Sequence, residues 1–383
     1  MAWAPNATVT IDGVAFTSNA LNGVTINYGR NNVWEQPRAG YAQIEILNTA
    51  DINNGFEIGE SVVITVQNST AVVKTVFTGV LTDVNNRIGA TGVAGETTIQ
   101  TVTAVAPMAK MARTLIGEVA YPVQTDTDRM TQILTEAGVT IDAIDSPFIY
   151  TFAARPANPG DAYSIAATYA TQGFGYIYET TDGKVGYANE AHRLNDMQAN
   201  GYYDIPENNI LWSGVQSQRT RNDIINDIVL TYDPSSYVTS TDATSSTMFG
   251  LASAKITTEI SNAPDAQLIA DRYVNIRSIP QNNLSAFTVM LDSPNLSNAT
   301  IDKLVTCYMG LPIQVQTLPL AISPTTYKGF VEGWTLRIGR VQASLTLRTT
   351  DSTFSLTPTR WQDVDPATAW NAIGATVQWY AYE

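Results

Sequence analysis

One order of residues occurs twice in this chain and limits the folds that it can adopt. Residues 77–84 read FTGVLTDV and residues 327–338 read YKGFVEGWTLRI, so an aromatic residue, a glycine two places later and two apolar residues recur in the same order. Both segments are rich in the β-branched and aromatic residues of strands. The recurrence indicates either two copies of one β unit or a chance likeness between two antiparallel domains.

The spacing of the glycines favours two copies. Gly59 lies 20 residues before Gly79, Gly310 lies 19 residues before Gly329, and each earlier glycine opens an alternating apolar segment. The flanking strands follow in the same order, and their hairpin loop is long in the first copy and tight in the second, as surface connections tolerate. The flanking pairs are 41–48 with 286–293 and 97–105 with 341–349. We therefore predict an internal duplication.

Length and periodicity divide the chain into four parts. Because 383 residues exceed what one core usually serves, several domains are expected. We predict a first β-barrel or sandwich over 1–106, an α+β insert over 107–205, a second β unit over 206–355 and a tryptophan-rich arm over 356–383. The predicted fold class is mainly β, with two antiparallel β-barrels and a small helix–helix–hairpin domain between them.

The insert changes from strand to helix periodicity. Asp126 is a candidate cap for a helix that ends at Gly138. A second helix is expected over 162–172, followed by two short strands around Asp182 and Gly183. The apolar positions of the first helix are Met130, Ile133, Leu134 and Ala137.

Two segments of the second β unit depart from strand periodicity. A helix is expected from Pro264 to Arg277, since proline suits a first helical position. Its inward positions are predicted to be Leu268, Ile269, Tyr273 and Ile276. Residues 235–247 are rich in serine and threonine without an apolar period, so we expect an exposed, mobile loop there.

The sequence lacks the usual patterns of catalytic and metal sites. We interpret His192, the only histidine, as part of a solvated polar connection, because no G-x-S-x-G segment offers it a serine. Cys307, the only cysteine, excludes an internal disulfide and a thiolate zinc cluster, and we expect it to be buried. Asp126 and Asp128 lack the remaining ligands of a calcium loop. We expect no catalytic residue, no metal and no cofactor.

Charge argues against a tight grip on nucleic acid. With 21 Lys and Arg against 35 Asp and Glu, the net charge is −14, so DNA that meets this surface is expected to pass without specific binding. No apolar run reaches the length of a membrane span.

Four patches in order resemble the minor tail proteins, or baseplate hub proteins, of long-tailed bacteriophages. GRNNVWEQPRAGYAQIEILN (29–48) resembles their opening barrel, and DRMTQILTEAGV (128–139) their short helix. TQGFGYIYETTDGKVGYAN (171–189) resembles the hairpin that follows, and YKGFVEGWTLRIGRVQASLTLRTTDSTF (327–354) the closing strands. The polar segment 235–247 has no counterpart in the resemblance.

The resemblance implies a structural protein at the distal end of a phage tail. It implies a homotrimer in which two tube-like barrels per chain make a ring of six, joining the six-fold tail tube or distal tail protein to a three-fold tip around the DNA exit channel. The implied neighbours are the distal tail protein or tail tube, the tape-measure protein, and a central fibre or other tail-tip proteins. Two similar units per chain give a trimer six similar positions.

The C-terminal arm carries Trp361, Trp370 and Trp379 at nine-residue intervals. Three tryptophans are costly to leave in water, so they are expected to dock, either on their own β unit or on a neighbouring subunit or tail-tip protein.

Two rival functions stay open on the sequence alone. The first is a carboxylate-dependent glycan hydrolase of the tail tip, because 35 acidic residues always permit some pair at a suitable separation. The second is a β module that binds host-surface carbohydrate, which the abundance of tyrosine and tryptophan favours.

Overall fold

The computed structural model describes residues 3–17, 20–48, 54–90, 97–213, 215–233, 235–280, 283–284, 286–319, 325–340 and 342–354. The predicted arm with Trp361, Trp370 and Trp379 lies outside the described residues.

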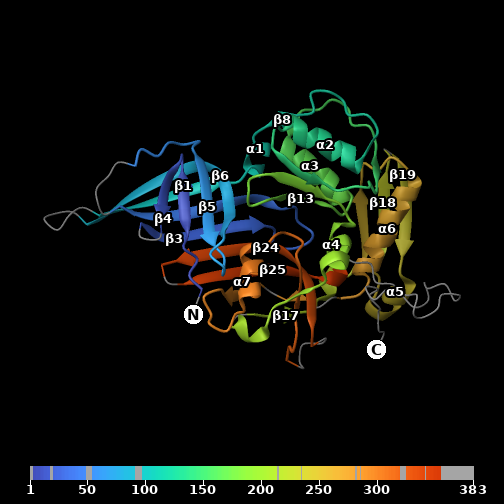
Figure 1. Cartoon of the computed structure of the whole chain (residues 1–383). Helices are drawn as coiled ribbons and strands as arrows, with labels where there is room; N and C mark the ends of the chain where they lie inside the picture. Colours follow the sequence, from blue (N-terminus) through green and yellow to red (C-terminus); the bar gives the residue numbers. More distant parts are fainter. Residues whose placement is uncertain are drawn as a thin grey trace.

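Seven antiparallel strands build the first β unit, at the left of Figure 1. In β1, β3, β4 and β5 alternate side chains are buried, as at Val9 and Ile11 of β1, so one face of each of these strands is turned to the core. The strands pair in the order β3-β4-β7-β6-β5-β1-β2. Their bounds are β1 Thr8–Ile11, β2 Val14–Thr17, β3 Leu21–Gly29, β4 Arg38–Asn48, β5 Ser61–Gln67, β6 Val73–Ala90 and β7 Thr97–Val105.

The second β unit pairs its strands in the order β16-β22-β25-β24, with β23 beside the first half of β24. Helix α7 lies between β22 and β23 in the chain. The strands are β15 Tyr203–Asp204, β16 Ile210–Leu211, β17 Ser217–Gln218, β21 Asn283–Leu284, β22 Phe287–Met290, β23 Pro312–Val315, β24 Tyr327–Gly339 and β25 Ala343–Asp351. The helical elements are η1 Glu207–Asn209, η2 Arg221–Asp223, α7 Asn298–Val305 and η3 Ser352–Phe354.

The two β units share one sheet. The second half of β24 pairs antiparallel with β3, from Gly333 opposite Gly29 to Gly339 opposite Gly23, and we call this contact the β24–β3 seam. The result is a 13-stranded sheet whose described strands form an open path. The prediction of a mainly β chain is confirmed, whereas two separately closed barrels are not what the described strands form. The physical reason is that β24 is much longer than β23, so half of its edge is left for β3.

The two glycine-marked strand groups have the same pairing. The order β4-β7-β6-β5 matches β22-β25-β24-β23 strand for strand. Gly79 faces the residue three places after Gly59, and Gly329 faces the residue three places after Gly310. Both earlier glycines have positive φ, 100° at Gly59 and 89° at Gly310. The likeness in sequence is therefore also a likeness in register.

Hydrogen bonds and an irregularity repeat as well. Gly59 N donates to Leu81 O at 2.8 Å, and Gly310 N donates to Val331 O at 2.8 Å. The pairing of β6 with β7 shifts just after Leu81, and the pairing of β24 with β25 shifts just after Val331. A bulge therefore stands at the same place in both groups, and Glu332 occupies it in the second.

The recurring aromatic and glycine pair has a steric cause. A Cβ on Gly79 would lie 2.8 Å from the ring of Phe77 and 2.3 Å from the carbonyl oxygen of Val105. A Cβ on Gly329 would lie 2.7 Å from the hydroxyl of Tyr327 and 2.6 Å from the carbonyl oxygen of Thr350 on β25. In a strand, residues two apart share a face, so each buried aromatic ring covers the glycine that follows it.

The insert forms the two helices and the hairpin that the sequence predicts. Helix α2 buries its predicted apolar positions and ends before Gly138, whose φ is 63°. Its cap is Thr125 instead of Asp126, because the Thr125 hydroxyl accepts from Asp128 N at 3.1 Å. The elements are α1 Met108–Met111, β8 Leu115–Ile116, β9 Gln124–Thr125, α2 Asp126–Glu136, β10 Ile141–Ile144, β11 Thr151–Phe152, β12 Gly160–Asp161, α3 Ala162–Gln172, β13 Tyr176–Glu179, β14 Val185–Ala188 and α4 His192–Asn200.

A small sheet stands where a mobile loop was predicted. Strand β19 (Ser236–Thr241) pairs with β18 (Asp227–Tyr232), and helix α5 (Ala243–Phe249) follows, so the expectation for 235–247 was wrong. The sheet gains β20 (Ser253–Thr257), and α6 (Ala263–Arg277) is capped by Asn262. On β19, Tyr237 is exposed and Val238 is only partly buried, which is why apolar periodicity failed there. On α6, Leu268 is 53% exposed and not inward as predicted.

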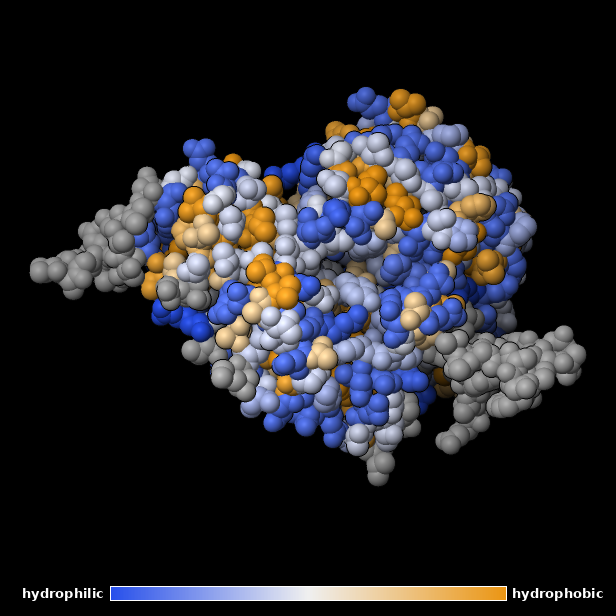
Figure 2. Space-filling view, in the orientation of Figure 1, coloured by the Kyte–Doolittle hydropathy of each residue, from blue (hydrophilic) through white to orange (hydrophobic). Residues whose placement is uncertain are grey.

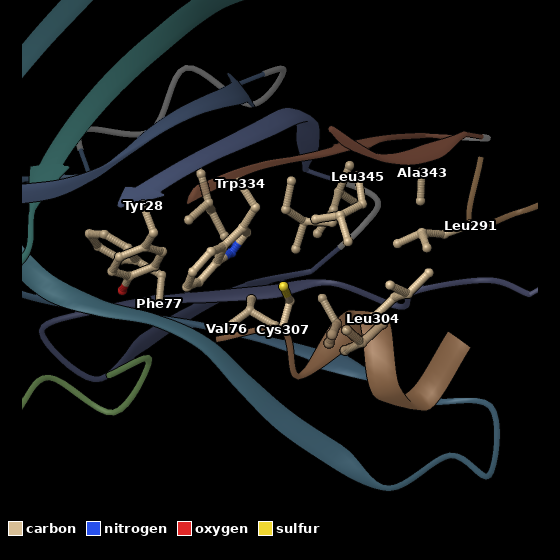
Figure 3. Close-up of a cluster of buried hydrophobic side chains, with 14 of the residues drawn as sticks. Tyr28, Val76, Phe77, Leu291, Leu304, Cys307, Trp334, Ala343 and Leu345 are labelled. Atoms are coloured by element: carbon tan, nitrogen blue, oxygen red, sulfur yellow. The ribbon is translucent and has the colours of Figure 1, made fainter. Parts of the chain in front are cut away.

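The described residues form two large hydrophobic cores, and neither follows the sequence order of the four parts. The first combines both β units: Figure 3 shows Val76 and Phe77 facing Tyr28, Trp334 and Leu345 across one cluster. The buried Cys307, as predicted, belongs to the same cluster. The second core joins α2 and α3 of the insert to β18 and α6, so it draws on both sides of the expected boundary at residue 205.

Candidate functional site

A cavity of about 520 Å³ opens where the insert meets the second β unit. His192 begins α4, and its Nδ1 lies 2.9 Å from Asp145 Oδ2. The His192 side chain is 26% exposed. The sequence predicted a solvated polar connection here, and the structure has a partly buried histidine that begins a helix and pairs with Asp145. The polar lining of the cavity includes Asp142, Asp145, Tyr178, His192, Asp196 and Tyr308.

The cavity has acidic and aromatic groups but no positioned nucleophile. A histidine held by a carboxylate is part of a nucleophile-activating arrangement, yet within the described residues no serine, threonine or cysteine hydrogen-bonds to His192. Burial raises the pKa of Cys307 to about 12, which keeps it a thiol. Tyr308 donates to Asp196 at 2.9 Å, so this carboxylate is already engaged. The described residues contain no group of three or more side chains suited to a metal. The arrangement can bind polar ligands.

A buried charged cluster lies where the first β unit, the insert and the second β unit meet. Arg30 follows β3, Arg193 lies on α4, and Glu332 occupies the bulge of β24. Glu332 Oε2 accepts from Arg30 Nε at 2.6 Å and from Arg193 Nη2 at 2.8 Å. We call these three residues the arginine–glutamate cluster. It joins the three parts of the chain through one oxygen atom.

The electrostatics of this cluster are dominated by burial and by the two guanidinium groups. The side chain of Glu332 is fully buried, and those of Arg30 and Arg193 are 3% and 5% exposed. Burial alone would raise the pKa of Glu332, but the charges of Arg193 and Arg30 outweigh it and hold that pKa below its usual value. Both guanidinium groups also lie over the ring of Tyr176, at 5.2 Å and 5.0 Å from its centre. The cluster therefore carries a net positive charge in a water-excluded place.

The β24–β3 seam is reinforced by side chains on both strands and by β25. Thr335 Oγ1 donates to Asn27 Oδ1 at 2.5 Å, and the rings of Tyr28 and Trp334 lie 5.1 Å apart. From β25, Arg348 donates to the carbonyl oxygens of Tyr28 at 2.6 Å and Arg30 at 3.1 Å. Besides the backbone ladder, the seam has both polar and apolar contacts.

A second carboxylate attaches the insert to the first β unit. Glu179, at the end of β13, accepts from Gly40 N of β4 at 2.6 Å and from Met108 N of α1 at 2.5 Å. Burial raises the pKa of Glu179 to about 7, although both backbone donors act in the opposite direction.

Of the remaining residues singled out in the sequence, Asp126 has a structural role. Its carboxyl accepts from Thr127 N at 2.8 Å and Ile149 N at 3.3 Å, and burial raises its pKa to about 6. Asp128 hydrogen-bonds the hydroxyl of Thr125 at 2.8 Å. The candidate interface residues Trp361, Trp370 and Trp379 lie outside the described residues.

The sequence analysis missed Glu332 and Glu179, although one signal was available. Glu332 is the single acid in the apolar run GFVEGWTL, and an acid flanked by strand residues that are all buried requires a partner. For Glu179 there was no such signal, because its donors are backbone groups.

The surface has no dominant apolar patch on the face in view. Figure 2 shows polar colour over most of that face, with apolar residues in small groups. No helix of the described residues is long and apolar enough to cross a bilayer.

Comparison with known proteins gives a match in fold. No known family model matches the sequence, and no curated protein does. The structure of the prophage MuSo2 43 kDa tail protein from Shewanella oneidensis is similar over 92% of this chain and 99% of its own, with a TM-score of 0.64 and 12% identity. A tail protein from Neisseria meningitidis MC58 is similar over 92% of this chain and 98% of its own, also with a TM-score of 0.64 and 12% identity. The prophage tail protein gp18 from Listeria monocytogenes EGD-e covers 90% of this chain and 94% of its own, with a TM-score of 0.55 and 9% identity. Nearly the whole chain therefore has the fold of these phage tail proteins.

Proposed function

We propose that this chain is a structural hub of a phage tail tip, located in the virion at the distal end of the tail. The observation that carries the proposal is a fold shared with phage tail proteins over nine-tenths of the chain and almost all of theirs. Both alignments span nearly the full length of each chain, so the likeness covers both β units and the insert together. A structural role in the tail follows from this likeness, and enzyme activity is not part of the proposal.

The hub is a homotrimer in which six strand groups surround the channel for DNA. Support comes from the two glycine-marked groups, which share strand order, register and bulge. Three chains with two such groups each provide six similar positions, which suits a junction between a six-fold tube and a three-fold tip. The tube-like barrels of this proposal would be completed by neighbouring chains. A net charge of −14 favours passage of DNA without binding.

The neighbours in the proposal are other tail components. The six-fold side meets the distal tail protein or tail tube, the tape-measure protein ends near the channel, and the three-fold side carries a central fibre or other tail-tip proteins. The four-part division at residues 106, 205 and 355 belongs to the same proposal, with the arm as an interface element.

Oligomeric state is the test of the hub. Light scattering over a range of protein concentrations should give three times the chain mass of 41.5 kDa, and negative-stain images should show a ring with six lobes. A particle that stays monomeric at high concentration, and in the presence of its distal tail protein, would refute the hub.

The arm is proposed to anchor a neighbouring subunit or tail-tip protein through Trp361, Trp370 and Trp379. Removing residues 358–383 should leave the unfolding transition of the remaining chain unchanged and weaken assembly. Normal assembly without the arm would refute its interface role.

A tail-associated glycan hydrolase is the alternative that the acidic cavity favours. Its chemistry would have to use Asp142, Asp145 and His192, which line the same space. Release of soluble fragments from purified cell wall, lost on Asp145→Asn, would support it. The absence of turnover together with a trimeric ring would favour the hub.

A host-surface carbohydrate-binding module would bind glycans as an isolated monomer.

A further inference from the structure

Strand β24 is paired along both of its edges. One edge runs beside β25 for almost its whole length. The other edge pairs first with β23, from Tyr327 to Phe330, and then with β3, from Gly333 to Gly339. The second half of β24 is therefore enclosed, and its inward side chain Ile338 is only 5% exposed.

Strand β6 is the counterpart of β24, and its second half lacks that enclosure. One edge of β6 pairs with β7, and the other pairs with β5 only from Val73 to Val80. From Thr82 to Ala90 the described residues place no strand on that edge. Ile88, the counterpart of Ile338, is 71% exposed. In Figure 1 this end of β6 lies at the left of the molecule.

The strand that corresponds to β3 in the second unit is the segment β16–β17. Strand β3 pairs with β4, and the counterpart of β4 is the segment β21–β22. Ile210 and Leu211 of β16 pair with β22, and Ser217 and Gln218 of β17 pair with β21, both antiparallel. On their other side the described residues place no strand beside β16 or β17. The second half of β6 thus lacks the neighbour that β3 gives to β24. The counterpart of β3, the segment β16–β17, lies at the opposite end of the chain's strand order.

These two edges cannot satisfy each other within one chain. In the sheet order, β22, β25, β24, β3, β4 and β7 stand between β16 and β6. At about 4.8 Å per strand the edges are separated by tens of ångströms of sheet. The partner with the right strand is a second copy of this chain.

We propose that residues 82–90 of β6 pair antiparallel with the β16–β17 segment of a neighbouring copy, repeating between chains the β24–β3 seam found within one chain. This inference rests on the proposed trimer and specifies its contact. The seam places Thr335 opposite Asn27 and Trp334 opposite Tyr28. The seam also places Gly333 opposite Gly29, and Gln218 pairs with Asn283 as Gly29 pairs with Arg38. The same register therefore places Asp83 opposite Gln218, and Val84 opposite Ser217, of the next copy.

Edge pairing of this kind has a physical reason. An unpaired strand edge presents backbone donors and acceptors in a row, and a long one promotes uncontrolled association unless it is covered. A contact in which β6 of each copy receives β17 of the next is head-to-tail, so it either closes into a ring or continues into a filament. With two strand groups per chain, closure at three copies alternates seams within and between chains.

Disulfide trapping tests the register. Neighbouring pairs in an antiparallel ladder have Cα atoms about 4.5 or 5.5 Å apart, and both separations permit a disulfide. We therefore combine Asp83→Cys with Gln218→Cys in one chain, and Val84→Cys with Ser217→Cys in another. The native Cys307 is buried, and its raised pKa keeps it from competing. Mild oxidation should give species of two and three chains on a non-reducing gel and nothing larger.

Two controls separate this contact from chance collisions. Each single cysteine variant should give little cross-linking. Asp83→Cys combined with Glu118→Cys, an exposed site in the insert, should stay at the level of the single variants. Independently, Ile88→Asp should leave the unfolding transition of the monomer unchanged, because the side chain is already in water, yet raise the concentration needed for assembly about tenfold or more.

The outcomes distinguish this contact from the hub itself. Three-chain species from either register pair, together with weaker assembly of Ile88→Asp, support the seam between chains. A trimer by light scattering whose register pairs do not cross-link above the controls overturns the seam and leaves the hub intact. Absence of any trimer overturns both, and species larger than three chains overturn the closed ring.

Discussion

Replacing Glu332 with glutamine should destabilise the chain by about 3–5 kcal/mol. Glutamine has nearly the same shape, so it can still accept from both arginines, and the charge is what changes. Arg30 Nε and Arg193 Nη2 both contact Oε2, at 2.6 Å and 2.8 Å, so these two nitrogens are no more than about 5 Å apart. Two positive charges at that distance repel by about 3 kcal/mol at an effective dielectric constant of 20. In the wild type the carboxylate charge offsets this repulsion, and glutamine leaves it uncompensated.

Urea unfolding followed by tryptophan fluorescence measures the effect. The control is Glu118→Gln, the same change at an exposed turn, which should alter the free energy of unfolding by less than about 0.5 kcal/mol. A second variant, Arg193→Met, keeps an apolar stem and leaves the Arg30–Glu332 pair electrically balanced. It should cost less than Glu332→Gln if charge balance governs the cluster.

The reasoning is refuted if Glu332→Gln costs less than about 1 kcal/mol, because a truly buried carboxylate between two guanidiniums cannot be neutralised so cheaply. It is also refuted if Arg193→Met is the more damaging change, since shape and hydrogen bonds would then outweigh charge.

Two further predictions concern the joints between the parts. Gly29→Ala should lower the melting temperature and broaden or split the unfolding transition. The backbone φ of Gly29 is 84°, and a Cβ there would lie 2.2 Å from the carbonyl oxygen of Glu332. The control is Gly13→Ala, which has a similar φ of 82° but open space around it. Glu179 has its folded pKa raised from 4.5 to about 7, so its contribution to stability is fully present below about pH 4.5 and is lost as pH rises through 7. Glu179→Gln loses an acceptor and should be less stable than the wild type at pH 5. The difference in unfolding free energy between the two proteins should narrow by about 3 kcal/mol towards pH 8. A difference that widens with pH contradicts the raised pKa.

Much of the local structure could be predicted because its causes are local. The spacing of Met130, Ile133 and Leu134 reports a buried helix face directly, and all three are buried. The spacing of Gly59 and Gly79 was equally readable, because a strand tolerates a glycine under an aromatic ring only where backbone and ring approach closely.

The β24–β3 seam and the arginine–glutamate cluster could not be predicted in this way. Arg30 and Glu332 are 302 positions apart, and no periodicity connects them. The segment from Ser236 to Thr241 failed for another reason: its strand is held by backbone pairing with β18 and is only partly buried, so it needs no apolar alternation.

The β24–β3 seam also determines when the edge of β3 can be paired during synthesis. Strand β3 leaves the ribosome early, but the strand that covers its second edge is completed about 300 residues later, as the 308 positions between Asn27 and Thr335 indicate. At about 5–20 residues per second, that edge waits some 15–60 seconds without its partner. A nascent chain is therefore exposed to wrong strand pairing for most of its translation, and one truncated before β24 never covers this edge.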